Sequence, residues 1–156
     1  MHNTVISSGN ALDVRDVSGP VLIANNAIYA QGQAIRLISG DIVRVQLAGN
    51  VGAGGLSGAS TGYTDGNGIA SDMVNGNYAG GPPIDPFPAQ GSALIGAGNA
   101  DNIVADDFNG TPRSGAADVG AYKFVEGGNP GWQIAEGFKS MAPAKTPNPP
   151  ENLQTD

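Results

Sequence analysis

The chain has 156 residues with a net charge of −7, and its seven lysines and arginines are scattered. It therefore offers no basic patch for nucleic acid or an anionic membrane, no apolar run long enough to span a bilayer, and no signal peptide. The absence of cysteine and the single, terminal His2 exclude disulfides, thiolate chemistry, multi-histidine metal sites and a Ser-His-Asp triad within the chain.

A repeated pattern begins the chain. Residues 2–14 align with residues 25–37 at a constant offset of 23, and residues 21–26 align with residues 45–50 at an offset of 24. A period of this size, made of short apolar alternations separated by glycine and asparagine, is typical of a solenoid of β-strands. Strands are expected at residues 5–6, 11–14 and 21–24 and, in the second coil, at residues 28–30, 34–38 and 43–48.

The alternation of residues predicts which side chains line the inside of a coil. From Leu12 to Arg15 apolar and charged residues alternate, so Leu12 and Val14 should point inward and Asp13 and Arg15 outward. Equivalent positions of neighbouring coils lie about 4.8 Å apart, which places Asp13 against Arg36 on the outer face. This pair is either a surface ion pair or part of a sugar-binding strip.

The same stacking predicts an asparagine ladder. Asn3, Asn26 and Asn50 occupy equivalent positions at a corner of successive coils. There the side-chain amides can satisfy the hydrogen-bonding groups of the bending backbone. These residues are therefore predicted to have a structural role.

A third coil begins at Asn50 and is predicted to give way to a long loop. Residues 52–91 are rich in glycine, serine, asparagine and proline, and the prolines of residues 80–83 and 85–88 exclude a central strand. A loop of this length either carries function or covers the end of the solenoid.

Candidate ligand-binding residues lie in this loop. Tyr63, Asp65, Asp72 and Tyr78 are predicted to contact sugar, although the tyrosines also fit a local core. Residues 65–68 resemble the beginning of a calcium loop but lack its distal glutamate. A plain turn is therefore favoured. No metal ligand is assigned, and calcium is the only cofactor considered.

Ordered segments return near the C-terminus. Asn109-Gly110 indicates a tight turn. Residues 117–124 are predicted to form a closing strand with Val119, Ala121 and Phe124 turned inward. The predicted organisation is a coil region with its closing segment at residues 1–126, a short packing segment at 127–142, built on Trp132, Ile134 and Phe138, and a proline-rich linker at 143–156.

The repeats and three C-terminal segments resemble the right-handed parallel β-helix, or pectate-lyase-like, superfamily. The segments are SALIGAG (residues 92–98), DFNGTPR (107–113) and DVGAYKF (118–124). They are similar to the boxes SPAIDAG, DFDGxPR and DIGAYEF that end many extracellular bacterial proteins of this kind, and depart from them at Ala93, Gly96, Asn109 and Lys123.

This resemblance implies an all-β fold, a right-handed parallel β-helix fragment of about two to three coils with a loop-rich C-terminal capping segment. It also implies an extracellular or cell-surface location, as the C-terminal part of a longer protein. In such endings Arg113 and Asp118 are expected to pair and to pin the closing loop onto the last coil.

Two functions remain open at this point. One is a non-catalytic module that is structural and binds polysaccharide. The other is a polysaccharide lyase or glycoside hydrolase, and the hydrolase needs clustered carboxylates. Asp101, Asp106 and Asp107 are the nearest acidic cluster, with Arg113 as a candidate proton acceptor, but paired acids in a turn also fit simple turn caps.

The first coil is expected to mediate assembly. A coil without a covering layer exposes unpaired backbone groups and apolar side chains, which favours edge-to-edge pairing. We therefore predict a homo-oligomer, a dimer that meets through residues 2–14.

Overall fold

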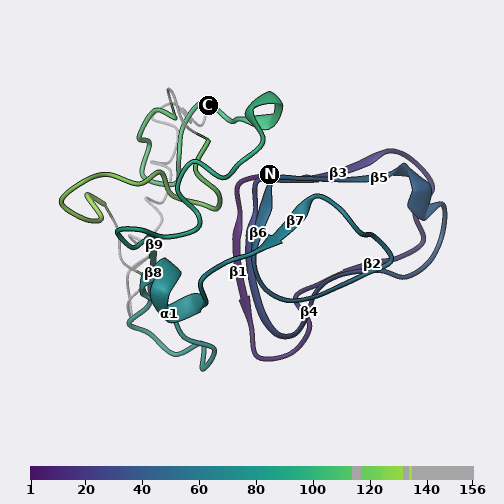
Figure 1. The fold of residues 1–156 in the computed structure, drawn as a ribbon, viewed down its shortest axis with the longest axis horizontal. Coiled ribbons are helices and arrows are strands. Elements are labelled where there is room, and N and C mark those ends of the chain that lie inside the picture. Colours follow the sequence, from purple (N-terminus) through teal and green to yellow (C-terminus); the bar gives the residue numbers. More distant parts are fainter. Residues whose placement is uncertain (114–116, 132–133, 135–156) are drawn as a thin grey trace, which may run out of the picture.

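The structure is mostly β, and its first half consists of stacked passes of the chain. The computed structural model describes residues 1–113, 117–131 and 134. The stacked strands are β1 (Thr4–Ser7), β2 (Leu12–Val14), β3 (Val21–Ala24), β4 (Ala27–Leu37), β5 (Val45–Ala48) and β6 (Asn50–Ser57). In Figure 1 these passes lie over one another and outline a ring.

All pairs between these strands are parallel, in the register that the repeats predict. β1 and β2 both pair with β4, with partners 23 residues apart, and β3 pairs with β5, with partners 24 residues apart. The two strands expected at residues 28–30 and 34–38 are joined in β4, and a short 3-10 helix, η1 (Ile42–Arg44), precedes β5.

Apolar side chains of the stacked passes pack together inside the ring. The buried centre of this inner core is formed by Ile28, Ala34, Ile35 and Leu37 from β4, and Leu12 and Val14 pack against it. Asp13 and Arg15 are exposed, so the predicted alternation over residues 12–15 is confirmed. Burial of the inner face provides the hydrophobic stabilisation that holds successive passes together.

The predicted asparagine ladder forms at the corner before β1, β4 and β6. Oδ1 of Asn50 accepts hydrogen bonds from the backbone N–H and the side-chain amide of Asn26, at 3.1 and 2.9 Å. Oδ1 of Asn26 accepts the same two bonds from Asn3, each at 3.0 Å. The side chains thus satisfy backbone donors at the bend.

The expectation that the third coil ends at residue 52 is wrong. β6 pairs with β4 through Ser57, and β7 (Tyr63–Asp65) pairs with β6. Asn50 is matched with Tyr63, only 13 positions further along, so this pass takes a shortcut. Ala59 and Tyr63 pack against the inner core, and the segment with β7 runs inside the ring outline of Figure 1. Residues 58–63 therefore close this end of the stack.

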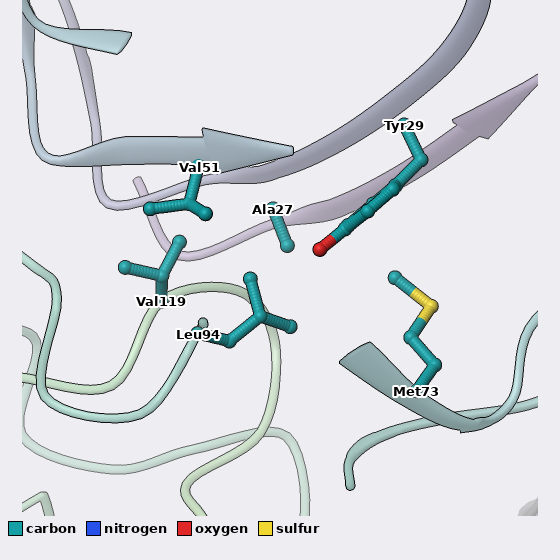
Figure 2. Packing of buried hydrophobic residues seen from close by; sticks show 6 residues of the cluster. All are labelled: Ala27, Tyr29, Val51, Met73, Leu94 and Val119. Carbon is teal, nitrogen blue, oxygen red and sulfur yellow. The ribbon is translucent and has the colours of Figure 1, made fainter. Parts of the chain in front are cut away.

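A second layer covers the outer face of the β1–β4–β6 sheet (Figure 1). It contains the helix α1 (Ile69–Asp72), the antiparallel pair β8 (Met73–Asn75) and β9 (Asp85–Pro88), and the 3-10 helix η2 (Ala100–Asn102). Figure 2 shows Met73, Leu94 and Val119 of this layer packed against Ala27, Tyr29 and Val51 of the sheet. Both faces of the sheet are thus buried.

The C-terminal segment departs from its predicted form. Residues 117–124 contain no strand, although Val119 and Tyr122 are buried, while Ala121 and Phe124 are partly exposed. The segment docks through the Gly120 N–H on the carbonyl of Asn25 and the Ala121 N–H on the hydroxyl of Thr4. Of the predicted packing segment, Ile134 pairs with Ile84, whereas Trp132, Phe138 and the linker at 143–156 lie outside the described residues.

Candidate functional site

Asp72 lies buried where the two layers meet. Oδ2 accepts hydrogen bonds from the hydroxyl of Tyr29 and the backbone N–H of Asn67, both at 2.7 Å. Oδ1 accepts from the Ser92 hydroxyl at 3.2 Å and the Ala93 N–H at 2.7 Å. The residue has no exposed surface, so the predicted sugar contact does not fit this position. Asp72 instead joins the stacked passes to the second layer.

The other candidates from the predicted loop are dispersed. Tyr63 packs against the inner core, and its hydroxyl lies 3.3 Å from the carbonyl oxygen of Ile28. Tyr78 packs against the outer core shown in Figure 2, and Asp65 is exposed. Burial raises the pKa of both tyrosines, with a smaller contribution from Asp65 at Tyr63. The tyrosines thus follow the local-core interpretation.

The three acidic residues near the C-terminus have separate environments. Asp107 caps its turn, because Oδ1 accepts from the N–H groups of Asn109 and Thr111 and Oδ2 from that of Lys123. Asp101 and Asp106 are exposed. In the part of the chain that the structure describes, no group of three or more His, Asp or Glu side chains could hold a metal ion.

Arg113 is buried, and its side chain holds the closing segment. Nη1 donates to the carbonyl of Asp118 at 2.9 Å, and Nη2 donates to the carbonyl of Gly120 at 2.7 Å. The Asp118 carboxylate instead accepts from the N–H groups of Gly96 and Phe124. The expected pairing is therefore corrected: Arg113 meets the backbone of Asp118, and each side chain pins a different part of the loop.

Asp13 and Arg36 form the predicted contact on the outer face. The guanidinium donates from Nε and Nη2 to the two carboxylate oxygens at 2.6 and 2.5 Å, and Arg15 approaches the carboxylate at 3.2 Å. These hydrogen bonds, chiefly those from Arg36, hold the pKa of Asp13 at about 2, below its usual 3.8. The pair is exposed to solvent on the outer face.

Replacement of Arg36 by glutamine is expected to raise the pKa of Asp13 toward 3.8, short of it because Arg15 remains. Since the folded-state pKa is lowered, the pair stabilises the fold above pH 3.8, and this contribution is lost as the pH falls toward 2. A carbon-13 NMR titration of the Asp13 carboxyl measures the shift. Arg44→Gln, which removes the separate Arg44–Asp41 pair, is the control and should leave Asp13 unchanged.

A hollow of about 420 Å³ lies between the first strand and the C-terminal layer. Its chemically distinctive lining residues are His2, Asp106, Asp107, Phe108, Arg113 and Tyr122. The sequence interpretation identified the two aspartates and Arg113 but did not bring them together with His2 and Phe108. The signal was weak, because His2 looks like a plain terminal residue and Phe108 like a single exposed aromatic in a turn.

Among the described residues, no helix is long and apolar enough to cross a membrane. A scan against models of protein families finds no match, and searches of curated proteins and of solved structures find no match either.

Proposed function

We propose that this chain is a non-catalytic module that ends a right-handed parallel β-helix in a secreted or cell-surface protein. Support comes from the parallel ladders at offsets of 23 and 24, the inward apolar alternation and the asparagine ladder. The right hand follows from the general rule for crossovers between parallel strands. The location rests on the resemblance of the sequence.

The observation that carries this proposal is the difference between the two ends of the stack. Residues 58–63 close one end, as described above. At the other end, β1, β2 and β3 each pair on one side only, and no other described strand pairs with their outer edges. These edges surround a hollow of about 510 Å³ lined by Val5, Leu12, Val14, Leu22 and Ile23 among others. Exposed backbone edges beside apolar side chains favour addition of further strands.

The occupant that we propose for this open end in the isolated chain is a second copy of itself. The interface would be isologous, because a two-fold axis places the same edge on both partners and makes the strands pair antiparallel. Thr4–Ser7, the β1 edge, carries no charged side chain, so two copies of β1 meet without like-charge repulsion.

Replacement of Leu22 by lysine is expected to convert the dimer into a monomer, because it places a charge on each side of the apolar interface. Leu22 lines the open end and is 40% exposed, so the monomer should keep its fold. Sedimentation equilibrium at several concentrations measures the change, with circular dichroism as the test of folding. Val43→Lys, at a residue that is 88% exposed and does not line this hollow, is the matched control.

A wild-type chain that stays monomeric at high concentration, or an L22K variant that dimerises as the wild type does, would contradict the proposed interface.

The enzymatic alternative, a polysaccharide lyase or glycoside hydrolase, receives less support. A glycosidase needs a pair of carboxylates that flank the scissile bond. The stacked outward pair on adjacent passes is Asp13 with Arg36, which have opposite charges. An assay for unsaturated or reducing-end products tests this alternative directly. Polysaccharide binding stays part of the proposed function, and the hollow beside Phe108 is a better place for it than Tyr63 or Tyr78.

A further inference from the structure

Two buried nitrogen atoms that line the 420 Å³ hollow have no hydrogen-bond partner among the described residues. They are Nδ1 of His2 and Nε of Arg113, whose side chains belong to residues only 7% and 3% exposed. A buried polar atom without a partner carries a desolvation penalty, so such atoms point to a group that the protein itself does not supply.

The contacts of His2 show what kind of atom its Nδ1 requires. Nε2 lies 3.2 Å from the carbonyl oxygen of Asn102 and 3.2 Å from Nδ2 of Asn25. The two hydrogens of Asn25 Nδ2 already have acceptors, the carbonyls of Asn99 and Asn102. Nε2 therefore carries the proton and donates it to Asn102.

Burial, followed by the charge of Arg113, lowers the pKa of His2, so the ring is neutral at pH 7 and Nδ1 is an acceptor. The nearby carbonyl of Asp118 cannot donate to it.

The two unpartnered atoms thus have opposite needs. Arg113 Nε is a donor that needs an acceptor, and His2 Nδ1 is an acceptor that needs a donor. A carboxylate or phosphate dianion can serve only the first, whereas a hydroxyl group can accept and donate. The carboxylates of Asp106 and Asp107 line the same hollow, so they would repel an anion and accept from hydroxyls.

Phe108 adds an apolar surface to these polar groups. Its ring is 46% exposed, and an edge-to-face contact with Tyr122, with 5.5 Å between ring centroids, holds it in place. Pro86 and Val104 also line the hollow, whose volume lies within the about 300–1,000 Å³ typical of small-molecule sites.

We propose that this hollow binds one neutral sugar unit. Its hydroxyl groups donate to His2 Nδ1 and to Asp106, one oxygen accepts from Arg113 Nε, and the apolar face of the ring lies against Phe108. This inference rests on the carbohydrate-binding part of the proposed function and is independent of the open end of the stack, whose test is self-association.

The experiment uses His2, the only histidine, as a reporter. Nitrogen-15 NMR of the imidazole is expected to show the neutral ring with its proton on Nε2. Titration with the methyl glycosides of glucose, galactose and mannose should shift the Nδ1 resonance and the backbone amides around Phe108 for at least one of them. The methyl glycoside of glucuronic acid, which carries a carboxylate, is expected to bind at least tenfold more weakly.

Two variants separate the sugar site from simple packing. Phe108→Ala and His2→Gln should each weaken binding at least tenfold, because the first removes the apolar surface and the second removes the acceptor at Nδ1. Val74→Ala, at another exposed apolar residue (54%) that does not line the hollow, should bind as the wild type does. Backbone amide spectra of the unliganded variants check that each is folded.

The proposal is overturned if none of the neutral glycosides shifts the His2 or amide resonances, if glucuronide binds more tightly than the neutral sugars, or if the free ring carries its proton on Nδ1. Normal sugar binding by a folded Phe108→Ala variant would likewise overturn the proposed contact with the ring.

Discussion

Replacement of Asp72 by asparagine is expected to lower the free energy of unfolding by about 3 kcal/mol, as a change that leaves a buried donor facing another donor. Each carboxylate oxygen accepts one backbone N–H, from Asn67 at Oδ2 and from Ala93 at Oδ1. Whichever oxygen becomes the amide nitrogen, one of these N–H groups loses its acceptor. The hydroxyls of Tyr29 and Ser92 can rotate, but a backbone N–H cannot.

Urea denaturation measures this loss, and amide hydrogen exchange at Asn67 and Ala93 locates it. Because Asp72 joins the two layers, exchange should increase at the outer core of Figure 2 more than at the inner core of the stack. Asp101→Asn, the same chemical change at an exposed carboxylate, is the control and should alter stability by less than about 0.5 kcal/mol. A D72N variant as stable as the wild type would mean that the four hydrogen bonds do not form.

The inner half of the fold was predictable because a stacked repeat compares the chain with itself. Val5 and Ile28, or Asp13 and Arg36, occupy equivalent positions in the text of the sequence, so the offset alone gives their register. The same comparison aligned Asn3, Asn26 and Asn50. No knowledge of distant segments was needed for any of these contacts.

The outer half was not predictable for a physical reason. Alternation indicates that Tyr29 points away from the inner core, but it does not indicate whether water or another segment covers that side. The cover is supplied by Met73, Leu94 and Val119, which come from a part of the chain without a repeat. The role of Asp72 depends on this cover and was hidden for the same reason.

Glycine also concealed part of the stack. β6 has the sequence NVGAGGLS, which looks like a loop because few side chains are large enough to pack. Backbone pairing does not require them, and close approach can forbid them. A Cβ added at Gly52 would lie 1.7 Å from the carbonyl oxygen of Ile28, so glycine is the residue that lets this strand pair with β4.

The predicted sugar-contacting residues failed for a related reason. Tyr63 and Tyr78 were chosen as aromatics within a polar segment, and both pack into cores. The hollow proposed for sugar instead combines His2 with Phe108 and Arg113, which lie more than a hundred residues further along the chain. Only the docking of the C-terminal segment on Thr4 brings them together.

Truncation of the asparagine ladder is expected to have a graded effect, largest for Asn50→Ala at about 4 kcal/mol, because several buried groups lose their partners at once. Asn50 is fully buried, accepts two hydrogen bonds from Asn26 and donates to the carbonyls of Ile23 and Gly62. Water cannot replace these partners without opening the corner.

Asn3→Ala, at the exposed end of the ladder, should cost about 1 kcal/mol or less in the monomer, since solvent reaches the groups that it leaves. Asn26→Ala should fall between the two. Urea denaturation of the three variants at low protein concentration gives the order, and an equal cost at all three positions would contradict the ladder. If a second copy stacks on the open end, the cost of Asn3→Ala should rise with protein concentration while that of Asn50→Ala stays constant, because only the outermost rung gains a new neighbour on association.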